Sequence, residues 1–272
     1  MLVTRERPTV FQIARRAWGS LDQALLWIAP LLIAGLALLS ARDAAFAELH
    51  DKLGIATLDA LEKSAKSGVS IGIAAVLPSF GLDMAVNLIT ALLTAPIAVA
   101  MHRFVLLEEI RRFTVLTPVT LRFAAWIFAF DTLAMIGIST ATLAHNGLPL
   151  LSGLLMVVLA VGLVILVIKT LVLFPAVAVE EQSDRTSNRI ETALNRSNGI
   201  FWLTVWSFML ASLPLGLVQA VTIFLLRHFN EPPIFIQLCR NAVTILTVAL
   251  GAAVASYLYS YAAHRGTPAA QP

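Results

Sequence analysis

The stretch that decides the fold runs from Phe123 to Ile168, FAAWIFAFDTLAMIGISTATLAHNGLPLLSGLLMVVLAVGLVILVI. It contains two apolar runs, each close to the roughly 20 helical residues that cross a hydrocarbon core of about 30 Å. Only His145, Asn146 and Gly147 separate the two runs. A polar turn this short joins antiparallel neighbours, so the stretch predicts a transmembrane helical hairpin.

The composition of the whole chain agrees with this reading. Of the 272 residues, 58% are hydrophobic and 13% are charged, whereas an ordinary soluble domain is about 25% charged. Such a composition excludes a soluble globular enzyme. Cys239 is the single cysteine, which excludes an intramolecular disulfide and a multi-cysteine metal cluster. The predicted fold class is all-α, a polytopic membrane helical bundle.

The same length criterion, applied to the whole chain, predicts one membrane domain with six spans. The spans cover about 21–40, 82–101, 123–143, 148–168, 200–226 and 241–262, and residues 263–272 form a tail. Residues 41–68 are expected to form an extracytoplasmic segment of two short amphipathic helices separated by Gly54. The apolar run 69–77 is too short to span, and a break at 78–81 suggests that it is interfacial or re-entrant.

The distribution of positive charge predicts the orientation in the membrane. Thirteen of the 19 Lys and Arg residues fall on the face that would hold both termini. Cytoplasmic loops are enriched in these residues, so both termini are expected in the cytoplasm, in a bacterial inner membrane. An alternative treats the start as a secretory signal cleaved after Ala45-Phe46-Ala47, but its apolar stretch is longer than the usual 7–15 residues. The scattered basic residues favour no nucleic acid partner.

The cytoplasmic segments resemble one another. Arginines stand one or two turns before an aromatic residue and a long apolar run ahead of spans one, three and five. Thr117 can cap a helix that has Pro118 at its first position, and Asn188 and Glu191 have capping-box spacing. The pattern suggests three repeated units, each an amphipathic helix followed by a transmembrane hairpin.

Asp131, near the middle of the third span, is the main candidate for an intramembrane polar site. An ionisable group inside a membrane is by default a functional candidate. It is either a structural carboxyl, protonated or hydrogen-bonded to Asn87, Thr90 or Thr94 of the second span, or part of an ion or proton pathway. Lys169 lies about 12 Å away in depth and is expected to extend to the cytoplasmic interface.

The search for enzymatic motifs is negative, and the sequence predicts no catalytic residue, no metal and no cofactor. The best metal-site alternative gathers His102, Glu108, Glu109, Glu180 and Glu181 on the cytoplasmic face. These carboxylates are instead expected to pair with the neighbouring arginines.

Basic residues near the predicted cytoplasmic face form a candidate site for anionic lipid. They are Arg15, Arg16, Arg111, Arg112, Arg122, Lys169, Arg189 and Arg196. Each basic residue close to an anionic leaflet gains about 1 kcal/mol, so this belt is expected to bind headgroups such as phosphatidylglycerol or cardiolipin. The alternative is that the charges only set topology.

Three motifs carry a family resemblance. The stretch PIAVAMHRFVLLEE (96–109), the stretch LVLFPAVAVEE (171–181) and NGIFW (198–202) resemble six-helix integral membrane proteins of alphaproteobacteria. Those proteins are similar to the membrane domain of some glycerophosphodiester phosphodiesterases. The chain has no phosphodiesterase domain, so the resemblance implies a stand-alone membrane domain with a scaffolding or assisting role.

Taken together, the residues favour a non-enzymatic membrane protein that acts as a scaffold, assembly factor or accessory subunit. Its expected partners are the lipid bilayer and other membrane protein subunits, or further copies of the chain in a homo-oligomer. The alternative is a small transporter or an ion or proton pathway centred on Asp131. Prolines at 30, 96 and 214 inside spans would fit the broken helices of transporters, although isolated prolines are ordinary in membrane helices.

Overall fold

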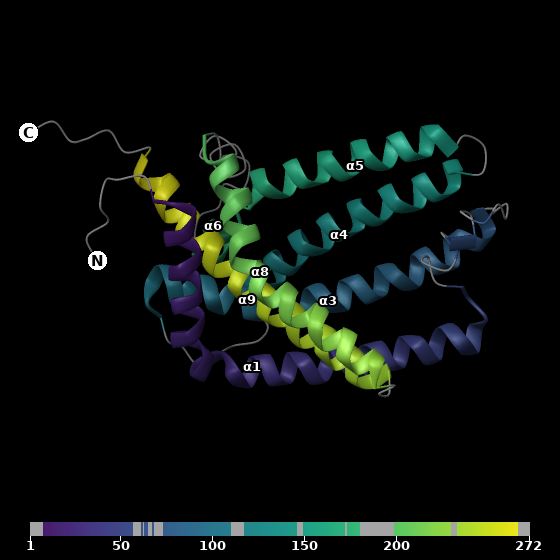
Figure 1. Ribbon diagram of the computed structural model, residues 1–272, viewed down its shortest axis with the longest axis horizontal. Coiled ribbons are helices and arrows are strands. Elements are labelled where there is room, and N and C mark those ends of the chain that lie inside the picture. The colour runs from purple at the N-terminus through teal and green to yellow at the C-terminus, as the bar shows by residue number, and fades with distance from the viewer. Residues whose placement is uncertain are drawn as a thin grey trace, which may run out of the picture. The chain divides into compact units, whose positions relative to one another are not determined.

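A computed structural model describes residues 8–56, 61, 63–64, 67, 73–109, 117–145, 149–171, 173–179, 199–229 and 233–265. Across these ranges the chain is all-helical and contains no strand. The helices are α1 (Val10–Leu53), α3 (Ile73–Leu107), α4 (Pro118–His145), α5 (Pro149–Thr170), α6 (Leu173–Val179), α8 (Phe201–His228) and α9 (Pro233–Arg265) (Figure 1).

Five of these helices are long and apolar enough to cross a membrane. The candidate spans within them are Val10–Leu53, Val76–Leu107, Pro118–Gly137, Phe201–His228 and Ile234–Ala263. Helix α5 contributes the shorter apolar stretch Met156–Leu166. The prediction of a membrane-embedded helical protein is therefore confirmed.

Two helices begin at reciprocal caps. Thr117 Oγ1 accepts from the Thr120 backbone N–H at 3.1 Å, and Thr120 Oγ1 accepts from the Thr117 N–H at 2.8 Å. The pair satisfies backbone donors that the first turn leaves free, as the Thr117-Pro118 pattern predicts. Thr9 and Gln12 form the same arrangement before α1.

Helix α1 is one uninterrupted helix of 44 residues. The expectation that a separate amphipathic helix follows residue 40 is wrong, although the helix does end at Gly54, whose φ is +62°. Gln23 and Glu48 are exposed polar side chains, and all exposed side chains between them are apolar. This belt of about 23 residues is about 34 Å long, enough for a hydrocarbon core. The lipid-facing part of α1 thus extends further toward its C-terminal end than the predicted span 21–40.

Helix α3 corrects a second prediction. It continues from Ile73 through Pro78 and Gly81 to Leu107, so the expected break at 78–81 does not form. Pro78 is the sixth residue of the helix, and the helix continues through it. The Ser79 hydroxyl donates to the Ala56 carbonyl oxygen and so fastens the chain that follows α1 to this helix.

The prolines inside the spans do not interrupt their helices. Helix α1 continues through Pro30, α3 through Pro96 and α8 through Pro214. The broken helices typical of many transporter sites are therefore not formed at these prolines.

The chain divides into two compact units. Unit 1 comprises residues 1–36, 96–123 and 168–272, and unit 2 comprises residues 37–95 and 124–167. In unit 1 the middle of α9 forms the centre of packing, since Leu250, Val254 and Leu258 are fully buried. Small residues around them, from Ala249 to Ser256, let neighbouring helices come close.

Helices α8 and α9 of unit 1 pack side by side as a hairpin (Figure 1). One close contact is at Gly251, where an added Cβ would lie 2.9 Å from Phe208 Cζ. Only glycine fits against this ring without displacing it. The contact also fixes the register of the two helices, because it places Phe208 level with Gly251.

Candidate functional site

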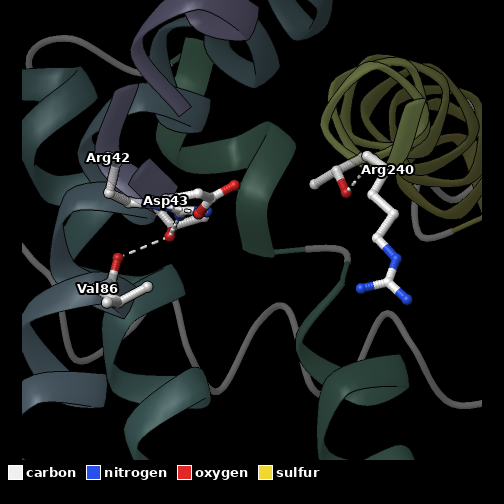
Figure 2. A network of polar contacts seen from close by, with 6 residues as sticks. Arg42, Asp43, Val86 and Arg240 are labelled. Atoms are coloured by element: carbon white, nitrogen blue, oxygen red, sulfur yellow. Dashed lines mark hydrogen bonds and ion pairs between the residues drawn. The ribbon is translucent and has the colours of Figure 1, made fainter. Parts of the chain in front are cut away.

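The main polar cluster of unit 2 contains an ion pair between neighbouring residues of α1. Arg42 Nε donates to Asp43 Oδ1 at 2.9 Å, and Arg42 NH1 donates to Thr90 Oγ1 of α3. Thr90 in turn donates to the Val86 carbonyl oxygen at 2.7 Å. Figure 2 shows Arg42 and Asp43 beside Val86. The two side chains are only 11% and 19% exposed although they lie within the apolar belt of α1, so their charges are directed into the bundle.

A polar stripe on α3 continues this cluster. Asp83, Asn87, Thr90 and Thr94 follow one another at spacings of four, three and four residues, which puts them on one face of the helix. The amide of Asn87 donates to Met135 Sδ of α4. That contact turns the α4 face carrying Met135 toward the stripe.

The same contact sets the register between α3 and α4. The helices are consecutive and joined by a short connection, so they run antiparallel. With Asn87 level with Met135, one helical turn places Asp131 level with Ala91 and Thr132 level with Thr90. Ser139, one turn in the other direction, is level with Asp83. Together with the polar groups of α1 and α3 described above, these residues form a polar seam, which comprises Arg42, Asp43, Asp83, Asn87, Thr90, Thr94, Asp131, Thr132 and Ser139.

Two hydroxyls of the polar seam are buried without a hydrogen-bond partner. They are Thr132 Oγ1 and Ser139 Oγ, both on the α4 face that carries Met135. Ser139 is 7% exposed. A buried polar group left unpaired costs about 1–3 kcal/mol, and such groups in native proteins commonly mark a bound water, ion or ligand.

The predicted partners of Asp131 lie within about one helical turn of its level but are bonded elsewhere. Asn87 reaches Met135, Thr90 binds Arg42 and the Val86 carbonyl, and Thr94 donates to the Thr90 carbonyl oxygen at 2.8 Å. Asp131 itself is half-buried. A hydrogen bond from Asp131 to one of these three residues remains a prediction.

Unit 1 holds a buried histidine that the sequence analysis placed at a span end. His102 of α3 is 1% exposed, and its Nδ1 lies 2.8 Å from Ser256 Oγ of α9. The Ser256 hydroxyl donates its one proton to the Ala252 carbonyl oxygen at 2.9 Å. It therefore accepts from His102, which assigns the proton to Nδ1. The ring also packs on Phe123 of α4, with centroids 5.6 Å apart.

The described part of the chain does not bring together the residues of the metal-site alternative. His102 faces Ser256, and Arg103 Nε donates to Glu109 Oε2 at 2.9 Å, as expected for a carboxylate paired with arginine. No group of three or more potential metal ligands occurs among the described residues. Glu180 and Glu181 lie outside them.

Three members of the predicted lipid site are described with their side chains. Arg15 and Arg16 of α1 and Arg122 of α4 are exposed, and all three belong to unit 1. Arg111, Arg112, Arg189 and Arg196 lie outside the described residues, as does the side chain of Lys169. Trp18, which follows Arg15 and Arg16 on α1, donates its indole N–H to the Ala211 carbonyl oxygen of α8 at 3.1 Å.

These features define a helical membrane protein with polar groups directed into its interior. Comparisons of the chain with family models, with curated proteins and with solved structures found no match. The resemblance to the membrane domain of glycerophosphodiester phosphodiesterases therefore stays a prediction.

Proposed function

We propose that this protein is a non-enzymatic accessory subunit of a bacterial inner membrane, which binds another membrane protein through the α8–α9 hairpin. The proposed topology has six spans, arranged as three related hairpins, with both termini in the cytoplasm. The single observation that supports the binding role is an exposed arginine, Arg240, inside an apolar belt of this hairpin.

The belt is formed by the outward face of α8. Every exposed side chain from Trp202 to Leu225 is apolar, and Arg227 is the first exposed charge after it. The buried residues of α8 end at Leu215. The half of the helix nearest the hairpin turn therefore presents apolar side chains on all its exposed faces, among them Val221 and Phe224.

Arg240 of α9 lies within the depth of this belt. Starting from the Phe208–Gly251 contact, the antiparallel register places Arg240 level with Gln219. This level is about eight residues, or about 12 Å, from Arg227. Arg240 is exposed, and its guanidinium extends clear of the α9 ribbon (Figure 2).

A charge at this depth favours a carboxylate on a partner helix. An arginine side chain covers only about half of the distance to the polar end of the hairpin, so extension to the headgroups leaves its charge in hydrocarbon. A charged group there costs at least about 2.5–3.5 kcal/mol unless it is paired. A transmembrane helix with an Asp or Glu at that level would supply both apolar contacts and the opposite charge. The partner is thus proposed to be a different protein with an intramembrane acid.

Site-specific photocrosslinking in intact membranes tests the proposal. A benzoyl-phenylalanine crosslinker at Val221 is expected to give one discrete protein adduct, because the partner helix covers this face. Arg240→Gln should reduce the adduct at least about tenfold, since an unpaired carboxylate would then remain in the partner. The same crosslinker at Val161 of α5, an equally exposed apolar position, is the matched control and should not give this adduct.

The adduct must also satisfy the charge requirement. Mass spectrometry should identify a partner with an acidic residue in a transmembrane helix, and exchanging the two charges, with Arg240→Asp and the partner's acid changed to Arg, should restore crosslinking. An adduct of two copies of this chain would show that the hairpin forms a homo-oligomer instead. Lipid adducts alone, equal at both positions, would contradict the proposal.

We also propose that the basic belt binds anionic lipid. The support is that Arg15, Arg16 and Arg122 are exposed in unit 1, which also presents the exposed Trp202 and Trp206. Replacing the three arginines with Gln should strip bound phosphatidylglycerol or cardiolipin in native mass spectrometry while insertion stays intact. The replacement of Lys52, an exposed lysine of unit 2, with Gln is the control. Unchanged lipid retention would mean that the charges only set topology.

A further inference from the structure

We propose that the polar seam holds one exchangeable proton, carried by Asp131 next to the buried, unpartnered hydroxyl of Thr132. This proton site lies in unit 2 and is independent of the proposed docking of a partner on α8–α9 in unit 1.

The first step is the charge balance at one level of the seam. Thr90 binds Arg42, and the register places Thr132, next to Asp131, at the level of Thr90. Arg42 carries one positive charge, and Asp43 neutralises it through their direct contact. Asp131 then adds one negative charge, and no second cation beside Arg42 neutralises it at this level. Leaving that charge in the apolar belt costs at least a few kcal/mol, so one further positive charge is favoured.

The other ionisable groups around Asp131 do not supply this charge. On α3 the nearest is Asp83, about two turns away and itself an acid. Helix α5 packs on α4 at Gly137, where an added Cβ would lie 3.4 Å from Leu159. Between residues 149 and 167, α5 has no ionisable residue. Among the described residues of α3 and α5 no cation supplies this charge, so we infer that it comes from solution.

The second step decides between a proton and a larger cation. Three groups of α3 that could ligate a metal ion are engaged: Thr90 with Arg42, Asn87 with Met135, and Thr94 with its own helix. The two unpartnered hydroxyls of α4, Thr132 and Ser139, lie about two turns apart, too far to bind one ion together. Arg42 also repels a metal cation at this level. A proton needs no cavity and no ligand shell. Binding forms one O–H bond at an Asp131 carboxylate oxygen with a proton taken from bulk water, and release returns that proton to water.

The third step is the pair of unpartnered hydroxyls. Thr132 Oγ1 and Ser139 Oγ lie on the same α4 face, about two turns apart, and both are buried without a hydrogen-bond partner. A hydroxyl donates one hydrogen bond and accepts others, so it can bind either a carboxylate or a carboxylic acid. Thr132, next to Asp131 in the chain, places such a hydroxyl near the acid, whereas Ser139 lies about two turns from it. A hydroxyl of this kind can stabilise either state of Asp131, which is the property that an exchangeable proton requires.

Infrared difference spectroscopy of the full-length protein in lipid vesicles tests the proposal. Changing the buffer from mildly alkaline to mildly acidic is expected to produce a carboxylic C=O stretching band, which shifts in D₂O. Asp131→Asn should remove this band. Asp22→Asn, which changes an exposed carboxyl of α1, should leave it in place. An unchanged band in Asp131→Asn, or a band controlled by Na⁺ at constant pH, would overturn the proposal.

A second variant keeps the test valid if Asp131→Asn does not fold. Thr132→Val removes one buried hydroxyl with little change in shape, and circular dichroism checks that the helical content is retained. Loss of a hydrogen bond to the acid should move the C=O band to higher frequency. An unmoved band would show that the hydroxyl does not share the proton. Val221 crosslinking is expected to be normal in both variants, so a failure of the proton proposal can be distinguished from a failure of the partner proposal.

Discussion

Replacing Asp43 with leucine is expected to lower the free energy of unfolding by about 3–5 kcal/mol. The substitution removes the counter-charge of Arg42, whose side chain is only 11% exposed and lies within the apolar belt of α1. The guanidinium would keep its contact with Thr90 but lose its carboxylate. Reversible unfolding in mixed detergent micelles, followed by circular dichroism, measures the change.

A second ion pair on the same helix provides the control. Glu48 and Lys52 are 2.6 Å apart, but both side chains are more than 60% exposed. Glu48→Gln should therefore cost less than about 0.5 kcal/mol. Replacing Arg42 and Asp43 together by leucine should recover much of the loss, because no buried charge remains. Equal effects of Asp43→Leu and Glu48→Gln would contradict the buried position of the pair.

His102→Ala is expected to cost about 3 kcal/mol. The substitution leaves a cavity at a fully buried position, and it removes the ring that packs on Phe123, which in turn contacts Phe174 at 4.9 Å. The hydrogen bond to Ser256 is lost as well. One side chain thus connects α3, α4, α6 and α9 in unit 1, and the same unfolding assay measures its contribution.

Two further variants separate packing from hydrogen bonding in this cluster. Ser256→Ala leaves the His102 Nδ1 proton without an acceptor and should cost about 1–3 kcal/mol. The double variant should cost clearly less than the two single changes combined, since both remove one shared interaction. His228→Ala, at an exposed histidine of α8, should stay within about 0.5 kcal/mol. A His102→Ala variant as stable as this control would contradict the described core.

The long apolar helices as such could be predicted from the sequence because apolar length is a local property. The residues at which the helices begin and end could not be predicted from the sequence. The sequence around Arg42 and Asp43 predicted the start of a polar segment. Nothing in the sequence shows that the two charges neutralise each other or that Arg42 also donates to Thr90. The Pro78-Ser79-Phe80-Gly81 stretch read as a break for a similar reason, although α3 begins only a few residues earlier and continues through it.

The candidate site was predicted in part. Counting residues along the spans placed Asn87, Thr90 and Thr94 near the depth of Asp131, and the Asn87–Met135 contact supports this register. The sequence could not identify the unpartnered hydroxyl of Ser139, because its burial depends on the facing helix. His102 was missed as a core residue because it stands at the end of an apolar run, and only α9 supplies its partner Ser256.

The boundaries between the two compact units lie inside helices. They fall between Leu36 and Ala37 of α1, Ala95 and Pro96 of α3, Phe123 and Ala124 of α4, and Val167 and Ile168 of α5. Cutting the chain at any of them would sever a helical turn and leave its backbone N–H and C=O groups without their intrahelical partners. Neither unit can therefore be excised, duplicated or exchanged as a module. Fragment complementation would have to divide the chain at a connection between helices, so that each fragment carries material from both units.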